Sequence, residues 1–258
     1  MTRIGVVLRP EMAPEALIDA ARAADAAGVD EVWIWEDCFY SGGVSTAAMI
    51  LAATNRVSVG IGVLPTPMRN VASTAMEIAT VARIHPGRLR VGLGHGVQSW
   101  MDQIGGRVHS PLTLLSEQMA ALTSLLAGET VTVHGRYVSL DDVRLNWPPQ
   151  QPPPLLVGAT GPKTLALSGR SSVGTILTSE TSPDQLRTAV EHIGGGPDHD
   201  VVVYVSCLSD SDAAPSTVQR WIDAGATTIV LEPSPDRSDL AGLFDAAASL
   251  TATFTAPQ

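Results

Sequence analysis

Residues 88–100 read R-L-R-V-G-L-G-H-G-V-Q-S-W and show how this chain is built. The apolar run at 89–93 is typical of a buried β-strand. It breaks into Gly94-His95-Gly96, and glycine lets a backbone approach a ligand closely because no Cβ intervenes. We therefore predict that His95 projects from the carboxyl end of a strand, with Trp100 following shortly after it.

Seven further β-rich runs alternate with helical segments along the chain. They lie at residues 4–8, 29–35, 57–63, 155–157, 174–177, 201–206 and 227–231. Strands separated by helices imply right-handed βαβ units in a parallel sheet. Eight such units in 258 residues favour a closed (β/α)8 TIM barrel, formed as a single α/β domain over 1–258. The structural alternative is an open, doubly wound sheet.

Residues 129–153 do not follow the alternation of strands and helices. The run V-T-V-H-G-R-Y-V-S-L contains paired β-like stretches around His134-Gly135, a pattern typical of a hairpin. The proline-rich segment at 147–154 then indicates an extended connector. We interpret 129–153 as an excursion between barrel strands four and five.

Composition excludes several classes of protein. The net charge of −10 argues against binding to nucleic acid or to an anionic membrane. The apolar runs are too short for a membrane span or a signal peptide, so we expect a cytoplasmic protein. Cys38 and Cys207 lie far apart, and the spacing of possible ligands predicts neither a disulfide framework nor a metal site.

In such a barrel the active site lies at the carboxyl ends of the strands. Asp37, and less strongly Glu36, is a candidate acid or base after strand two. The glycines in V-G-I-G-V predict a bulge near Gly62 and Val63 in strand three. Arg69 follows on the next loop as a candidate ligand for an anionic substrate.

Two further strand ends carry candidate residues. After strand four, His95 is a candidate proton donor and Trp100 a candidate stacking surface for the substrate. After strand five, G-A-T-G-P-K opens a helix whose free N–H groups suit a phosphate. The predicted phosphate-binding residues are Gly158, Ala159, Thr160, Gly161 and Lys163. Each set also has a purely structural interpretation, as a packed histidine or tryptophan and as a glycine-rich helix start.

Other polar features carry less weight. The run G-L-G-H-G-V has valine where a dinucleotide-binding fingerprint requires its third glycine, so we reject that interpretation. Glu180 and Glu232 follow strands six and eight, where each can simply cap a helix or pair with an arginine.

Three segments together resemble the luciferase-like monooxygenase superfamily, the flavin- and F420-dependent (β/α)8 barrels. They are R-L-R-V-G-L-G-H-G-V-Q-S-W-M-D-Q-I-G at 88–105, P-L-L-V-G-A-T-G-P-K-T-L-A-L-S-G at 154–169 and V-G-I-G-V-L-P-T-P-M-R-N at 59–70. The resemblance covers nearly the whole chain in the expected order.

This resemblance implies a cofactor, either coenzyme F420 or FMN, at the carboxyl ends of the strands. It implies a cis peptide at Gly62-Val63 behind the cofactor ring, a phosphate site at 158–161 and a pocket lined by Asp37. In that setting Gly94 and Gly96 provide clearance for a flat ring. Many members are homodimers, and the excursion often covers the site.

The mechanism implied is hydride transfer between the bound cofactor and a small organic substrate, with the protein supplying position and electrostatics. His95 would protonate or orient the substrate. The acidic tail of F420 favours F420 over FMN where Arg69 and Lys163 are available, although both cofactors remain open. Whether oxygen takes part is also open. The alternatives are a cofactor-free barrel lyase or aldolase and a non-catalytic flavin-binding homologue.

Overall fold

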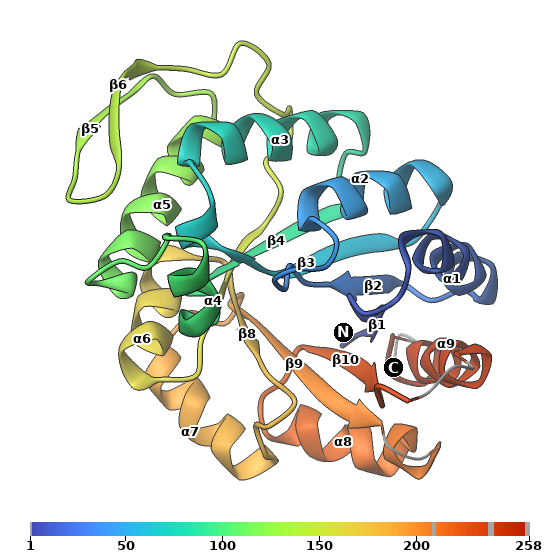
Figure 1. Ribbon diagram of the computed structural model, residues 1–258. Coiled ribbons are helices and arrows are strands. Elements are labelled where there is room, and N and C mark those ends of the chain that lie inside the picture. Colours follow the sequence, from blue (N-terminus) through green and yellow to red (C-terminus); the bar gives the residue numbers. More distant parts are fainter. Residues whose placement is uncertain (1, 208–209, 237–239, 256–258) are drawn as a thin grey trace.

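The strands of the protein close into a parallel barrel. The computed structural model describes residues 2–207, 210–236 and 240–255, and Figure 1 looks along the barrel with the helices around it. The strand order around the barrel is β1-β10-β9-β8-β7-β4-β3-β2, which excludes the open sheet. The strands are β1 (Arg3–Val7), β2 (Glu31–Ile34), β3 (Ser58–Pro65), β4 (Leu89–Gly94), β7 (Leu155–Gly158), β8 (Gly174–Leu177), β9 (Asp200–Cys207) and β10 (Thr228–Pro233).

Helices cover the outside of the barrel (Figure 1). They are α1 (Pro14–Ala27), α2 (Gly43–Ala53), α3 (Val71–Ile84), α4 (Gln98–Gln103), α5 (Pro111–Leu126), α6 (Pro162–Ser171), α7 (Pro183–Ile193), α8 (Pro215–Asp223) and α9 (Ala241–Thr255). The short α4, which contains Trp100, is an element that the sequence pattern did not predict. None of the helices in the described ranges is long and apolar enough to span a membrane.

Local sequence signals set several helix ends. Helix α1 begins with Pro14 and ends at Gly28, whose φ of 87° is a left-handed conformation that glycine adopts without a steric penalty. The Asn70 side chain accepts hydrogen bonds from backbone N–H groups in the first turn of α3. Ser182 and Gln185 form a capping box at the start of α7. These caps fix where each βα loop begins and ends.

The excursion contains a two-stranded antiparallel hairpin, β5 (Val131–His134) and β6 (Ser139–Val143). Glu117 on α5 accepts hydrogen bonds from three successive backbone N–H groups of the hairpin turn, at residues 136–138, over 2.8–2.9 Å. These bonds lower the pKa of the Glu117 carboxyl. The hairpin is therefore attached to the outer helix α5 rather than to the barrel strands.

The inside of the barrel is filled by large side chains facing small ones. Trp33 on β2 is fully buried and packs edge to face against Tyr204 of β9, with ring centroids 6.1 Å apart. The Trp33 ring occupies the space that a Cβ at Gly60 of β3 would need. A Cβ at Gly5 of β1 would also lie 2.9 Å from this ring. Glycines on the neighbouring strands therefore make room for the tryptophan.

A buried ionic cluster closes the amino end of the barrel. The Arg90 guanidinium donates to Glu31 over 3.0 Å and also bonds Asp200. The Trp33 indole N–H donates to the same Glu31 carboxylate over 2.9 Å, and Arg90 lies 5.1 Å from the centre of the Trp33 ring. The buried positive charge of Arg90 and the buried carboxylates of Glu31 and Asp200 therefore neutralise one another. These ion pairs link the first residues of β2 and β9 to β4 at the amino end of the barrel.

Candidate active site

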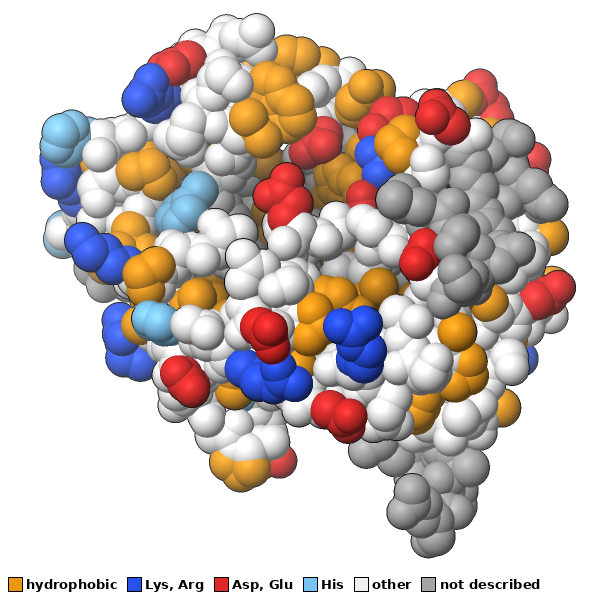
Figure 2. Space-filling view, turned by 90° about the horizontal axis from the view of Figure 1, so that it is seen from below, with side chains coloured by type: hydrophobic (Ala, Val, Ile, Leu, Met, Phe, Trp, Pro, Cys, Tyr) orange, Lys and Arg blue, Asp and Glu red, His pale blue; other side chains and the backbone are white. Residues whose placement is uncertain are grey.

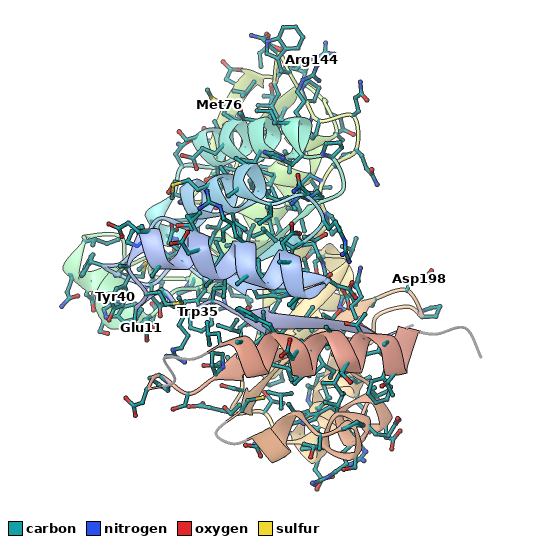
Figure 3. All side chains as sticks on the ribbon, turned by 90° about the vertical axis from the view of Figure 1, so that its right-hand side faces the viewer. Glu11, Trp35, Tyr40, Met76, Arg144 and Asp198 are labelled. Carbon is teal, nitrogen blue, oxygen red and sulfur yellow. The ribbon has the colours of Figure 1, made fainter. Side chains whose placement is uncertain are left out.

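A cavity of about 520 Å³ opens at the carboxyl ends of the barrel strands, and we call it the carboxyl-end cavity. The side chains around it come from every barrel strand except β1, or from the loops that follow those strands. They are Trp35, Glu36, Asp37, Gly62, Val63, Pro65, Gly94, His95, Gly96, Val97, Trp100, Gly158, Ala159, Thr160, Thr164, Ile176, Thr178, Ser179, Tyr204 and Glu232. In Figure 3 Glu11, Trp35 and Tyr40 lie at this end, and Asp198 lies at the other.

Most of the residues singled out in the sequence meet in this cavity. Those lining it are Asp37, Gly62, Val63, Gly94, His95, Gly96, Trp100, Gly158, Ala159 and Thr160. Gly161 and Lys163 do not line it; they lie at the N-cap and in the first turn of α6, next to Thr160. Glu180 lies in a neighbouring groove between α6 and α7.

Arg69, a candidate ligand for an anionic substrate, lies outside the set of residues that line the cavity. Its guanidinium binds both carboxylate oxygens of the buried Glu36, over 2.6 and 2.9 Å, and Glu77 over 2.7 Å. Glu36 also accepts a hydrogen bond from the Gly43 N–H, over 2.9 Å. Arg69 and Glu36 therefore neutralise each other and join the loops after β2 and β3. Such pairing depends on tertiary contacts that a single loop sequence does not reveal.

Strand β3 has an irregularity where the sequence predicts a bulge. Its pairing with β4 shifts register between Ile61 and Leu64, and the Gly62-Val63 peptide is cis. The Val63 side chain fits against two glycines: a Cβ built at Gly94 or at Gly158 would lie 2.6 Å from a Val63 methyl group. Val63 thus forms part of the cavity floor.

The packing around Val63 and Pro65 explains why glycine stands at two positions at the end of β4. Gly94 makes room for the Val63 side chain. Gly96 has a φ of +66°, and a Cβ there would lie 2.9 Å from Pro65. Contacts within the protein therefore account for both glycines, which also line the cavity, and their role beside a flat ring stays a prediction.

His95 lies at the mouth of β4 and is half-buried. Its Nε2 atom is 3.1 Å from the Thr164 hydroxyl of α6, while its buried Nδ1 atom has no hydrogen bond of normal geometry within the described ranges. Burial lowers the pKa of His95, and a backbone interaction at Pro111 opposes this only in part. The lowered pKa favours the neutral imidazole, which suits hydrogen bonding better than proton donation as an imidazolium.

Asp37 follows β2 and is oriented by a tryptophan two residues before it. The Trp35 indole N–H donates to Asp37 Oδ2 over 2.8 Å. Burial raises the pKa of Asp37, and the nearby Glu11 charge adds to the rise. The hydrogen bond from Trp35 and the charge of Arg9 lower the pKa of Asp37 but do not cancel the effect of burial. A carboxyl with a raised pKa is well suited to exchanging a proton.

Trp35 and Tyr204 form an aromatic wall that our interpretation of the sequence missed. Their rings are stacked, with centroids 5.9 Å apart and an angle of 30° between planes. The Tyr204 hydroxyl donates to the Gly62 carbonyl over 3.1 Å, and burial raises the pKa of this phenol. A signal was present: in E-V-W-I-W every second residue faces the barrel interior, as does Tyr204 within the strand V-V-V-Y-V.

Hydroxyl groups and a helix start lie on another side of the cavity. Thr160 precedes α6, Thr164 lies in its first turn, and Thr178 and Ser179 follow β8. The first N–H groups of a helix have no acceptor within it, so they attract anions. Lys163, in the same turn, is exposed. No group of three or more His, Cys, Asp or Glu side chains in the described ranges is arranged to hold a metal ion.

Comparison with known proteins assigns the chain to a family. Residues 1–254 match the family model described as luciferase-like monooxygenase. The chain belongs to this family. A 5,10-methylenetetrahydromethanopterin reductase from Methanolobus tindarius is 33% identical over 225 residues, which cover 82% of this chain and 68% of the relative. An F420-dependent glucose-6-phosphate dehydrogenase from Kineococcus radiotolerans is 29% identical, over 91% of this chain and 77% of the relative.

Solved structures share the fold of this luciferase-like protein. An F420-dependent secondary alcohol dehydrogenase in complex with an F420-acetone adduct superposes with a TM-score of 0.85 at 18% identity, covering 96% of this chain and 98% of that one. The oxygenating constituent of 3,6-diketocamphane monooxygenase from Pseudomonas putida, in complex with FMN, gives a TM-score of 0.76 at 16% identity, covering 97% and 96%.

The contact between Gly62 and Tyr204 yields a prediction about the floor of the site. A Cβ at Gly62 would collide with the Tyr204 hydroxyl, so Gly62→Ala is expected to be strongly destabilising. Tyr204→Phe removes the hydroxyl but leaves the Gly62 carbonyl without its donor, at a cost of about 1–3 kcal/mol. In the Tyr204→Phe background Gly62→Ala should cost at least about 1 kcal/mol less than in the wild type, measured by urea unfolding.

The exposed Tyr40 provides the matched control, because Tyr40→Phe removes a hydroxyl far from Gly62 and should leave the cost of Gly62→Ala unchanged. If Gly62→Ala alone does not fold, the double variant with Tyr204→Phe should still give folded protein. An equal cost of Gly62→Ala in both backgrounds would show that the hydroxyl does not limit the space at Gly62.

Proposed function

We propose that this member of the luciferase-like family is an oxidoreductase that binds coenzyme F420 in the carboxyl-end cavity and acts on a small organic substrate. The relatives named above include an F420-dependent dehydrogenase at 29% identity, and the F420-bound secondary alcohol dehydrogenase superposes with the higher of the two TM-scores. FMN is the second candidate, supported by the FMN complex of the monooxygenase component. Either cofactor supplies hydride chemistry when bound.

This proposal rests mainly on one observation: the carboxyl-end cavity has both an apolar floor and the start of helix α6 at its side. Val63 and Ile176 give an apolar floor on which a flat ring can rest. The threonines at 160, 164 and 178 and the first turn of α6 offer hydrogen-bond donors to a phosphate. Lys163, exposed in that turn, is available to an acidic tail. The residues present therefore fit a phosphorylated flavin or deazaflavin.

Asp37 and His95 would handle the substrate. Removing or adding a hydride at a carbon next to a hydroxyl or amine requires a proton to move at the neighbouring heteroatom. Asp37, held by Trp35 and with a raised pKa, is placed to hold that proton. His95 lines the same cavity and would orient the substrate through a hydrogen bond.

The geometry weighs against a cofactor-free lyase or aldolase. Schiff-base chemistry needs a lysine in the site. Lys163 is the one lysine of the chain, and it lies on the outer surface of α6, outside the set of residues lining the cavity.

Separate titrations with F420 and FMN test the proposal. We expect saturable binding of F420, followed by quenching of tryptophan fluorescence, with FMN binding more weakly. Thr160→Glu places a carboxylate at the start of α6 and should weaken F420 binding at least about tenfold, equivalent to roughly 1.4 kcal/mol. Thr130→Glu makes the same change at an exposed residue of the excursion and should have no effect.

Binding of FMN alone would contradict the choice of F420. Binding of neither cofactor would contradict an oxidoreductase function and support the non-catalytic or cofactor-free alternatives. Equal effects of the two Glu substitutions would contradict the position of the phosphate.

We also propose that the protein is a homodimer, as the family resemblance implies. Exposed hydrophobic side chains gather on α2, α3 and the end of the excursion, including Met49, Met76, Ile84 and Trp147. Met76, Ile84 and Trp147 border a groove of about 530 Å³ between α3 and residues 143–147, and Figure 3 shows Met76 and Arg144 in the same part of the molecule. Apolar patches of this kind are typical of protein interfaces.

Light scattering with size-exclusion chromatography tests this assembly. The wild type should have the mass of two chains, and Met76→Glu should shift it towards one chain because a charge would be buried. Val173→Glu changes an exposed apolar residue away from the groove and should leave the mass unchanged. A wild-type mass of one chain would contradict the homodimer.

A further inference from the structure

The carboxyl-end cavity has an acidic half and a hydroxyl-rich half. Asp37 and Glu232 lie at the ends of β2 and β10, whereas the threonines and Ser179 lie at β7, α6 and β8. No lysine or arginine lines the cavity among the described residues. In Figure 2 acidic and hydrophobic side chains lie around the hollow in the upper part of the molecule. A phosphate-bearing cofactor suits the hydroxyl-rich half, so the acidic half remains for the substrate.

The arginine near the acidic half is already neutralised. Arg9 donates to Glu232 Oε1 over 2.7 Å and to Glu11 over 2.8 Å. Its guanidinium also lies 5.6 Å from the centre of the Trp35 ring, which restricts its movement. Two carboxylates, those of Glu11 and Glu232, pair with this one guanidinium, and both Arg9 and Glu11 influence the charge of Asp37, so this region carries excess negative charge.

Asp37 has an oxygen left for a ligand. Trp35 donates to Oδ2, and Oδ1 has no hydrogen-bond partner within the described ranges. Glu36, by contrast, is bound by Arg69 and by a backbone N–H, so it is not available. An ionised carboxylate accepts hydrogen bonds but donates none. The Asp37 carboxylate therefore favours a substrate group that can donate a hydrogen bond to it.

Two tryptophan rings line the same cavity as the acidic residues. Trp35, stacked on Tyr204, and Trp100 of α4 both line the cavity. Flat apolar groups pack well against such rings, and a cation near a tryptophan face is attracted to it. An anionic substrate would be stabilised neither by the faces of the aromatic rings nor by the carboxylates.

We infer that the substrate is a flat or largely apolar molecule with a hydroxyl or amino donor and without an anionic group. This inference rests on the proposed function, because it concerns the substrate half of the same cavity. Asp37 Oδ1 receives the donor, and the rings of Trp35 and Trp100 hold the apolar part. Phosphorylated and carboxylated substrates, including sugar phosphates, are disfavoured because their anionic groups would lie beside the carboxylates of Asp37 and Glu232.

Binding of three matched probes to the F420-loaded protein tests this inference. Benzylamine, benzyl alcohol and benzoate share one ring and differ in charge, and their binding can be followed by tryptophan fluorescence. We expect benzylamine and benzyl alcohol to bind at least about tenfold more tightly than benzoate. Asp37→Asn keeps an acceptor for Trp35 but removes the charge, and should reduce the preference for benzylamine over benzoate to about threefold or less.

Asp141→Asn is the matched control, since Asp141 is an exposed aspartate of β6, and it should leave the preference unchanged. Benzoate binding as tightly as benzylamine, no binding of benzylamine at all, or an unchanged preference in Asp37→Asn would each overturn the inference. If F420 does not bind but the same preference appears in the protein alone, the proposed function fails and the charge selection of the cavity stands.

Discussion

The barrel depends on two aromatic side chains that need glycine beside them. Trp33 and Tyr204 fill the interior edge to face, and the neighbouring positions Gly5, Gly60 and Gly62 have no space for a Cβ. Interiors of proteins are close-packed, so large side chains on some strands require small ones on others. Because these glycines lie mainly on β3, that strand can depart from regular pairing where it reaches the cavity.

The same packing shapes the candidate site. The Tyr204 hydroxyl holds the Gly62 carbonyl, and the neighbouring Val63 side chain rests between Gly94 and Gly158. Below them, the cluster of Glu31, Arg90 and Asp200 closes the amino end. A floor built from the barrel interior is more rigid than one built from loops. The loops after β2, β4 and β7 then bring Asp37, His95 and Thr160 to one rim.

Much of this arrangement follows from sequence patterns. Eight alternations of strand and helix predict the barrel, and the carboxyl ends of parallel strands converge, so Asp37, His95 and Gly158 could be expected together. Contacts between distant segments could not be predicted from these local patterns. Arg69 looked free for a substrate but pairs with Glu36 and Glu77. Gly94 looked like ligand clearance but accommodates Val63. The alternation of residues along their strands indicates that Trp35 and Tyr204 face the barrel interior, but it does not reveal that the two rings stack.

The central claim is that one cavity holds the cofactor against Val63 and α6 and leaves its acidic half for the substrate. A crystal structure of the protein with F420 tests this most directly. We expect the ring on the Val63 floor, the phosphate at Thr160 and the first turn of α6, and open space beside Asp37. F420 bound elsewhere, or with its phosphate among Asp37 and Glu232, would contradict it.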